Sequence, residues 1–257
     1  YTTLFRSLMF THIGDHTLLH HIENSPERLD YWQQGLAAIE REPYAGATLP
    51  DQGYVPEVAR AAFARSGYQV QTNFYPPDRA RHMAESGEVD GWMPVHADPA
   101  LKSEYLLSAP LPGDQLGLLK RKDSPIRLPA DAIRRPAAAL EALADRRFGI
   151  TRGSLSGAAA AAVAPLRTER VALDLQNLDK LANGRIDLVL IDKYLAADLM
   201  ALQRPQYIGK LEFLSPVLFP SSFHLAFPLS SPRHAELQQA FDAGLKALEK
   251  DGSLNRI

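Results

Sequence analysis

The chain contains no cysteine among its 257 residues, which excludes disulfides, thiolate metal sites and thiol catalysis. No apolar run approaches the roughly 20 residues that a membrane-spanning helix needs. The formal net charge is only −2 and the sequence pI is ≈ 6.5, so no electrostatic argument favours nucleic acid or an anionic membrane as a partner. What is present is an ordinary globular composition, 46% hydrophobic and 23% charged, in a chain long enough to bury a core.

The N-terminal stretch differs from the rest of the chain. Residues 1–7 resemble a translated sequencing adaptor, so we expect residues 1–34 to be an artefact or leader and a signal peptide to have been lost by truncation. The spacing of His12, His16 and His20 would place three imidazoles on one helical face, which could form a metal-ligand set. The alternative is an out-of-frame remnant beside the adaptor. The sequence predicts neither a metal nor a cofactor.

One short phrase occurs twice. Gly87-Glu88-Val89-Asp90 and Gly184-Arg185-Ile186-Asp187 each follow a helical pattern and precede an apolar run. Glycine just beyond a helix favours left-handed backbone, and the apolar run that follows suits a buried parallel strand. The repeat predicts two similarly built lobes, with a cleft in which a small molecule binds. The alternative is a coincidence between two ordinary helix–strand junctions.

Hydrophobic periodicity predicts alternating strands and helices from residue 36 onward, which is typical of parallel sheets covered by helices. The first half is predicted to contain strands at 36–39, 68–74 and 89–93 and helices at 54–66 and 78–86. The middle is predicted to contain a solvated turn at 120–125, helices at 130–144 (kinked or begun at Pro136), 158–163 and 177–182, and strands at 148–151, 171–173 and 186–191. Residues 211–227 are predicted to be extended and 234–249 helical.

These residues resemble the periplasmic solute-binding proteins that serve amino-acid-type ABC importers. The landmarks are the 54–63 helix, Gly67-Tyr68, Pro77-x-Arg79-Ala80, Gly87-x-x-Asp90, Leu107-Ser108-Ala109-Pro110, Phe148-Gly149-Ile150, Gly153-Ser154, Asn183 to Asp187 running to Asp192, and Phe223 to Phe227. The resemblance implies an α/β fold of the two-lobed type 2 periplasmic-binding kind. Each lobe would be a mainly parallel sheet flanked by helices, and two crossing strands near 111–114 and 215–221 would join them. Residues 35–112 and 221–257 would form lobe 1, and 113–220 lobe 2.

The resemblance also implies ligand-binding residues. Tyr44 lies where relatives place an aromatic side chain against the ligand, although it could be a surface tyrosine in a turn. Gly153 and Ser154 precede a predicted helix whose N–H groups could receive a carboxylate, or Ser154 could simply cap that helix. Asp192 follows an apolar strand at the edge where α/β sheets bind ligands. In relatives the aspartate here takes the ligand's α-amino group; otherwise it would be a turn residue or helix cap.

The sequence departs from the family where amino-acid binders carry small hydroxyl residues and then an arginine that clamps the α-carboxylate. The chain instead runs from Trp92 to His96, with Leu101 or Lys102 at the place of the arginine. Lysine lacks the bidentate fork that suits a carboxylate. His96 is the expected polar replacement, and Trp92 with Tyr44 could form platforms for a bulkier, less zwitterionic ligand. Arg79 is expected either to offer a fixed cation to an anionic ligand or to lie in solvent.

The sequence therefore predicts a non-catalytic, monomeric periplasmic receptor. It would capture a small polar molecule, an amino acid or related compound, by hinge closure and deliver it to the permease of an ABC importer or to a sensor partner. No nucleic-acid partner is expected. One alternative is a ligand-sensing domain of a signalling protein, or the effector domain of a transcription regulator. Another is a dehydratase-type enzyme on the same fold, using Glu42, Asp192 or His96 as acid or base.

Overall fold

The computed structural model describes residues 35–257. The expectations for residues 1–34, including the histidine set at 12, 16 and 20, lie outside the described residues. Within residues 35–257, no group of three or more histidine, aspartate or glutamate side chains is placed to hold a metal ion. No helix in that part of the chain combines the length and apolar character needed to span a bilayer.

The described chain forms two compact units. Unit 1 consists of the described residues up to Leu111 together with Phe223–Ile257, and unit 2 is Pro112–Ser222. The chain leaves unit 1 in strand β5 (Leu111–Arg121) and returns to it in strand β10 (Phe219–Pro228). Each unit has its own group of paired strands and its own hydrophobic core.

The sheet of unit 1 begins with the predicted parallel arrangement. Strand β1 (Leu36–Ala38) lies between β2 (Thr72–Phe74) and β3 (Gly91–Val95) and is parallel to both. Strand β10 continues this sheet antiparallel to β3, and it also pairs antiparallel with β4 (Tyr105–Leu107). The β-α-β-α-β reading of the first half of the chain is confirmed.

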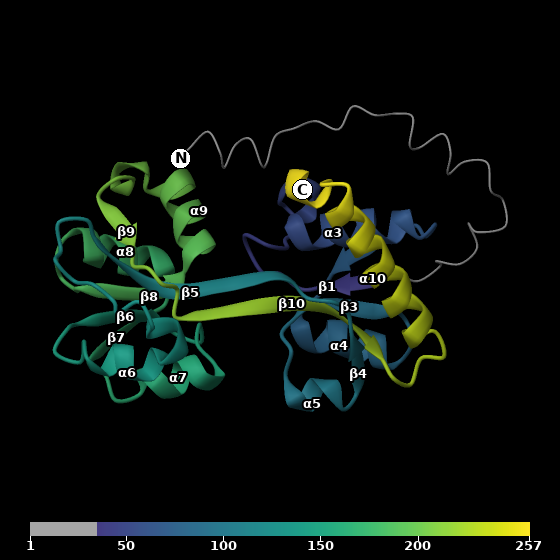
Figure 1. The fold of residues 1–257 in the computed structure, drawn as a ribbon, viewed down its shortest axis with the longest axis horizontal. Coiled ribbons are helices and arrows are strands. Elements are labelled where there is room, and N and C mark those ends of the chain that lie inside the picture. The colour runs from purple at the N-terminus through teal and green to yellow at the C-terminus, as the bar shows by residue number, and fades with distance from the viewer. Residues whose placement is uncertain (1–34) are drawn as a thin grey trace. The chain divides into compact units, whose positions relative to one another are not determined.

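Helices cover both faces of this sheet (Figure 1). Helices α3 (Tyr54–Arg65) and α10 (His234–Lys250) pack with Leu36 and Ala38 in one core cluster. Helix α4 (Pro77–Glu85) packs with the intervening Ala37 in another. Neighbouring residues of one strand thus serve opposite faces, as strand geometry requires.

Unit 2 repeats this plan around a mixed sheet. Strand β5 is antiparallel to β8 (Leu188–Asp192) and β9 (Leu211–Phe213), and β6 (Phe148–Thr151) is parallel to β8 and to β7 (Thr168–Val171). Helices α6 (Pro136–Glu141) and α7 (Gly157–Val163) pack on one face, and α8 (Asp174–Ala182) and α9 (Lys193–Gln203) on the other. The short helix α5 (Pro99–Lys102) belongs to unit 1. Single 3₁₀ turns lie at Pro50–Gln52, Ala132–Arg134, Pro205–Tyr207 and Leu254–Arg256.

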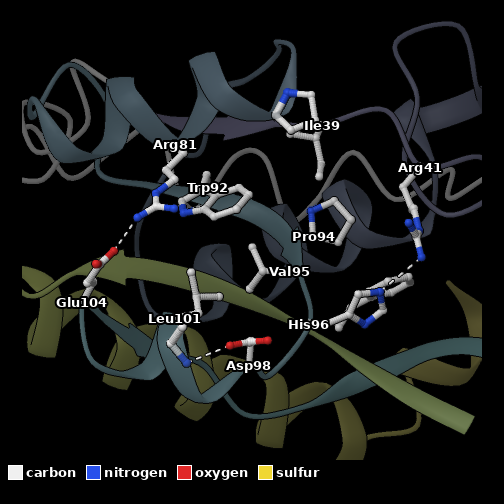
Figure 2. Close-up of a pocket in the computed structure, with 13 residues that line it drawn as sticks. Ile39, Arg41, Arg81, Trp92, Pro94, Val95, His96, Asp98, Leu101 and Glu104 are labelled. Atoms are coloured by element: carbon white, nitrogen blue, oxygen red, sulfur yellow. Dashed lines mark hydrogen bonds and ion pairs between the residues drawn. The ribbon is translucent and has the colours of Figure 1, made fainter. Parts of the chain in front are cut away.

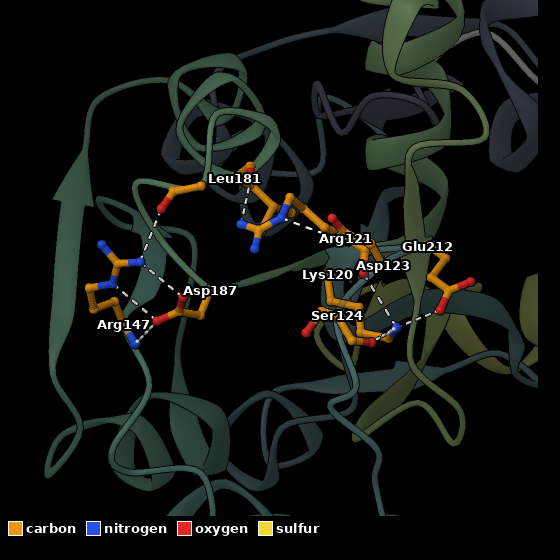
Figure 3. A network of polar contacts seen from close by, with 9 residues as sticks. Lys120, Arg121, Asp123, Ser124, Arg147, Leu181, Asp187 and Glu212 are labelled. Atoms are coloured by element: carbon orange, nitrogen blue, oxygen red, sulfur yellow. Dashed lines mark hydrogen bonds and ion pairs between the residues drawn. The ribbon is translucent and has the colours of Figure 1, made fainter.

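Lys120 contradicts the prediction of a solvated turn at 120–125. Strand β5 extends to Arg121, and the Lys120 side chain is only 1% exposed. Its Nζ donates to the carbonyl of Ser124 at 2.7 Å and pairs with Glu212 at 2.6 Å (Figure 3). A buried ammonium persists only with such partners. Glu212 comes from β9, far along the chain, so local composition could not reveal the pairing.

Several element boundaries also differ from the prediction. The strand predicted at 68–74 is paired only over Thr72–Phe74, because its neighbour β1 has just three residues. The strand predicted at 171–173 lies at Thr168–Val171, where β6 supplies the backbone partners. Helix α9 was not predicted, and it begins directly after Asp192 with no intervening loop.

Candidate functional site

A cavity of about 580 Å³ opens on unit 1 at the carboxyl ends of β1 and β3 (Figure 2). This is the edge at which α/β sheets hold their ligands. Its lining residues come from β3, from the segments that follow β1, β3 and α5, from α4 and α5, and from β10. They are Ile39, Arg41, Pro77, Arg81, Trp92, Pro94, Val95, His96, Asp98, Ala100, Leu101, Glu104 and Phe223.

The wall of the cavity is mainly apolar. Pro94 and Val95, the last residues of β3, are buried, and they offer the cavity neither a side-chain hydroxyl nor, at Pro94, a backbone N–H. Leu101 from α5 and Phe223 from β10 add aliphatic and aromatic surface. Apolar walls with a few placed polar groups are typical of small-molecule sites.

Arg41 and His96 lie together at one end of the cavity (Figure 2), and Phe223 contacts both of them. Arg41 Nη2 lies 3.2 Å from Nε2 of His96. The His96 and Phe223 ring centroids are 5.1 Å apart, and the Arg41 guanidinium carbon lies 5.9 Å from the Phe223 centroid. The guanidinium is thus held by a hydrogen bond and by an aromatic face.

Tyr44 fixes the turn that carries Arg41. The Arg41 N–H donates to the Ala45 carbonyl at 2.8 Å, and the Tyr44 N–H donates to the Arg41 carbonyl at 2.8 Å. The Tyr44 ring is 7% exposed and packs edge-on against Phe223, with centroids 4.9 Å apart. The structure therefore places Tyr44 in the core behind the cavity wall; its contact with a ligand stays a prediction.

A second polar cluster surrounds Arg81. Its Nε donates to Glu85 at 2.8 Å and its Nη2 to Glu104 at 2.5 Å. Tyr105 also donates to Glu85, at 2.8 Å. The hydrogen bond from Arg81 holds the pKa of Glu85 below its usual value, whereas burial, followed by the bond to Glu85, raises the pKa of Tyr105 to about 12. Because two carboxylates bind Arg81, its charge is largely compensated within the cluster.

Of the residues predicted for the site in lobe 1, Trp92 and His96 line the cavity. The Trp92 indole N–H is buried and has no hydrogen-bond partner among the described residues. Arg79 and Lys102 are exposed and lie outside the cavity lining. The Arg79 guanidinium instead stacks over the Tyr75 ring at 5.3 Å.

The site residues predicted in unit 2 are Gly153, Ser154 and Asp192, and none of them lines this cavity. Helix α7 begins at Gly157 after Ser156, so the prediction that Ser154 caps it is wrong. The Ser154 hydroxyl instead donates to the Thr151 carbonyl at 2.8 Å, because Gly153, with φ 74°, closes a tight turn after β6. Whether Gly153 and Ser154 contact a ligand stays a prediction.

Asp192 caps helix α9. Its Oδ1 accepts the backbone N–H groups of Tyr194 and Leu195 at 2.9 Å each, and its Oδ2 accepts the N–H of Gln115 at 2.6 Å. The helix-cap interpretation is confirmed; a contact with a ligand amine stays a prediction.

Sequence reasoning missed Arg41, Arg81, Glu104 and Phe223 as cavity residues. A signal existed for Arg41, because it closely follows the first strand and hence stands at the carboxyl edge of a parallel sheet. No signal existed for Phe223, since β10 joins this edge only through the return of the chain from unit 2.

One comparison with known proteins identifies a family. Residues 43–257 match the family model of bacterial extracellular solute-binding proteins, family 3. No curated protein sequence matches the chain.

Solved structures share the fold at low identity. An amino acid ABC transporter substrate-binding protein from Streptococcus pneumoniae, bound to L-arginine, is 18% identical with a TM-score of 0.57, covering 86% of this chain and 91% of that one. The arginine-, lysine-, histidine-binding protein of Geobacillus stearothermophilus is 16% identical with a TM-score of 0.56, covering 86% and 92%. The GluR0 ligand-binding core from Nostoc punctiforme, in complex with L-glutamate, is 16% identical with a TM-score of 0.58, covering 85% and 94%. They support the type 2 periplasmic-binding fold.

Proposed function

Because the chain belongs to family 3 of the bacterial extracellular solute-binding proteins, we propose that it captures a small polar solute, an amino acid or related compound, and delivers it to an ABC importer. The protein would act in the periplasm as a monomer, and delivery by hinge motion is part of the same proposal.

One observation carries the proposal within this molecule: the cavity at the carboxyl edge of β1 and β3. Its apolar walls would exclude water from the body of a solute, while the clusters around Arg41 and Arg81 would orient polar groups. In the described residues, this site is formed wholly by unit 1.

Binding without catalysis fits the state of the acidic groups at the cavity. Glu104 is paired with Arg81, and Asp98 accepts the Ala100 N–H at the start of α5. A dehydratase-type enzyme would need an acid or base poised toward the substrate beside a cationic clamp. His96, the remaining candidate base at the cavity, is engaged by the Arg41 guanidinium.

A thermal-shift screen tests the proposal. The wild-type protein would be heated with amino acids, polyamines, organic acids and aromatic acids, one at a time. A solute that binds only the folded state at a hundredfold excess over its Kd stabilises it by about 2.7 kcal/mol. We expect at least one solute to raise the Tm.

Two variants in which an alanine is replaced by phenylalanine test whether the solute binds in the cavity. Ala100→Phe places a ring on the cavity wall, whereas Ala130→Phe adds the same ring to an exposed position of unit 2. The shift should vanish in Ala100→Phe and persist in Ala130→Phe. A folded wild type that gives no shift, or a shift that survives Ala100→Phe, would contradict the proposed site.

A further inference from the structure

We propose that this cavity selects a solute whose polar head group carries an apolar side chain, and that Leu101, on a wall it shares with Trp92, is a residue that selects it. The inference rests on the proposed function, which leaves the chemistry of the solute open. A site for hydrophilic solutes would instead need polar groups of the wall to bind the side chain of the solute as well as its head group.

The ionisable side chains of the wall contact other groups of the protein. Arg81 is paired with Glu104, and Asp98 caps the start of α5. Arg41 and His96 lie within hydrogen-bond distance of each other. These side chains can still orient a polar head group, because a guanidinium has more donors than one partner uses. A second polar group on the solute would have to compete with contacts that already exist within the protein.

Carbon lines the cavity between the two arginine-containing pairs. Figure 2 shows Pro94 and Val95 between them. Pro94 has no N–H to offer, and Val95 is paired with His224 of β10. The carbonyl of Met93 accepts the Ile39 N–H at 2.9 Å. Because the sheet uses these backbone groups, the side chain of a solute would meet aliphatic surface here.

Trp92 also offers carbon to the cavity. Its indole N–H is buried and has no hydrogen-bond partner among the described residues, so the part of the ring that lines the cavity is carbon. The ring packs edge-on to Tyr105, with centroids 6.1 Å apart, and it contacts two core clusters. These neighbours hold the ring before a solute arrives, which lowers the entropy cost of binding.

Leu101 completes this wall from α5. Its side chain is half-buried and packs against a core cluster that includes Val95 and Tyr105, and it also lines the cavity. The Asp98 carboxylate accepts the Ala100 N–H at 2.7 Å and so fixes the turn that carries Leu101. Leu101 thus presents a preformed aliphatic surface at one of the two positions where the family resemblance would place an arginine.

Calorimetric titration with matched solutes tests the inference. L-Leucine and L-asparagine have the same head group and nearly the same shape, but the side chain of leucine is apolar and that of asparagine is an amide. The same two side chains occur in 4-methylpentanoate and succinamate, which lack the amine, and in isopentylamine and 3-aminopropanamide, which lack the carboxylate. L-Phenylalanine and 3-(4-pyridyl)-L-alanine form a pair with a larger side chain.

We expect the apolar member of at least one pair to bind wild type roughly tenfold tighter than its polar partner, because burying an amide without a hydrogen-bond partner is costly. Its binding should also show the more negative heat-capacity change, which reports apolar surface removed from water. Leu101→Asn should reduce the preference by roughly threefold or more, since it places an amide on the wall. Leu101→Met should keep it.

Leu107→Asn is the matched control. Leu107 is likewise half-buried against the same core cluster, but it does not line the cavity, so its exchange should leave the ratio of the two affinities unchanged. Because both affinities are measured in one protein, a smaller folded fraction cancels from their ratio. Equal affinities within every pair, tighter binding of the polar members, or a preference that survives Leu101→Asn would overturn the inference.

The outcomes also separate the inference from the function on which it rests. If hydrophilic solutes bind in a manner blocked by Ala100→Phe, and no apolar member binds tighter than its partner, the receptor stands and this inference falls. If apolar solutes bind but their binding survives Ala100→Phe, the cavity is not their site and both proposals about it fall. If no solute of either panel binds, both proposals fall as well.

Discussion

The two copies of the Gly-x-x-Asp phrase adopt the same backbone in the two units but differ in electrostatics. In unit 1, Gly87 has φ 77° and its backbone N–H donates to the Ala84 carbonyl, while the backbone N–H of Glu88 donates to the Met83 carbonyl at 2.9 Å. In unit 2, Gly184 has φ 69°, and the backbone N–H of Arg185 donates to the Lys180 carbonyl at 2.9 Å. Both are Schellman helix ends, in which glycine takes the left-handed conformation.

The two aspartates have opposite environments. Asp90 is 9% exposed, and burial raises its pKa although Nη1 of Arg233 lies 3.6 Å from its Oδ1. Asp187 is partly exposed and accepts the backbone N–H and the side chain of Arg147 at 2.9–3.0 Å, which lowers its pKa (Figure 3). The same phrase thus fixes a local backbone but not the protonation chemistry of its aspartate.

The residue after each aspartate differs for a packing reason. Unit 2 has Leu188, which is fully buried between β5 and β6. Unit 1 has Gly91, where an added Cβ would lie 2.6 Å from the Ala226 carbonyl oxygen of β10. In unit 2 the first residue of the strand after the phrase packs its side chain into the core. In unit 1 the backbone of β10 lies too close to this position for a side chain.

The largest expected effect comes from removing the side chain of Leu188, since the equivalent position of unit 1 is the glycine Gly91. Leu188→Ala should lower the free energy of unfolding by about 3 kcal/mol, because it removes buried apolar volume and leaves a cavity. Urea unfolding monitored by circular dichroism measures the loss. Leu202→Ala, at a position that is 73% exposed, should change stability by less than about 0.5 kcal/mol. Equal costs in the two variants would contradict the core role of Leu188.

Adding a side chain where unit 1 has none should cost somewhat less. Gly91→Ala should destabilise by about 2 kcal/mol, because the neighbouring atom is a backbone oxygen that cannot move without disturbing β10. Gly46→Ala is the control, since the three atoms nearest to its added Cβ all belong to the side chains of Glu40 and Leu49, at 3.1 Å. The same urea titration should give it a smaller cost. If Gly91→Ala is as stable as wild type, close backbone approach does not explain this glycine.

The two helix-ending glycines should behave alike, which sharpens the comparison. Gly87→Ala and Gly184→Ala should each cost about 1 kcal/mol, because alanine is strained at positive φ. Asparagine tolerates this conformation better, so Gly87→Asn and Gly184→Asn should cost less in thermal unfolding. A difference between alanine variants of the two units beyond about 1 kcal/mol would break the equivalence of the two helix ends.

The smallest effects should separate the two aspartates by pH. Asp187 has a lowered folded-state pKa, so its contribution is present above its ordinary value of 3.8 and is lost as the pH falls through the lowered value. The destabilisation by Asp187→Asn should therefore shrink in acid. Asp90 has a raised pKa, so the wild type should gain stability relative to Asp90→Asn as the pH falls from neutral toward 3.8. Urea midpoints measured from pH 7 to pH 3 should give slopes of opposite sign; slopes of the same sign would contradict these environments.

Sequence patterns predicted most of the regular elements because their signals are local. Helices such as α3 and α10 show apolar residues at helical spacing, and the glycines after α4 and α8 mark their ends. The strand boundaries were less accurate, since the length of a strand depends on its neighbour, as β2 shows against the three residues of β1. Asp192 was placed correctly at the end of its strand, but its three backbone donors include Gln115 from a distant strand.

The sequence by itself determined the order of helices and strands, the repeated helix–strand junction and the family resemblance, because each depends on residues close together in the chain. Only the tertiary structure decided which side chains share the cavity. Arg41, His96 and Phe223 meet there because β1, β3 and β10 lie side by side in one sheet. It also decided that Lys120 is buried and that Tyr44 supports the wall from behind. Burial and pairing depend on segments far apart in sequence, and local periodicity carries no information about which distant segments will meet.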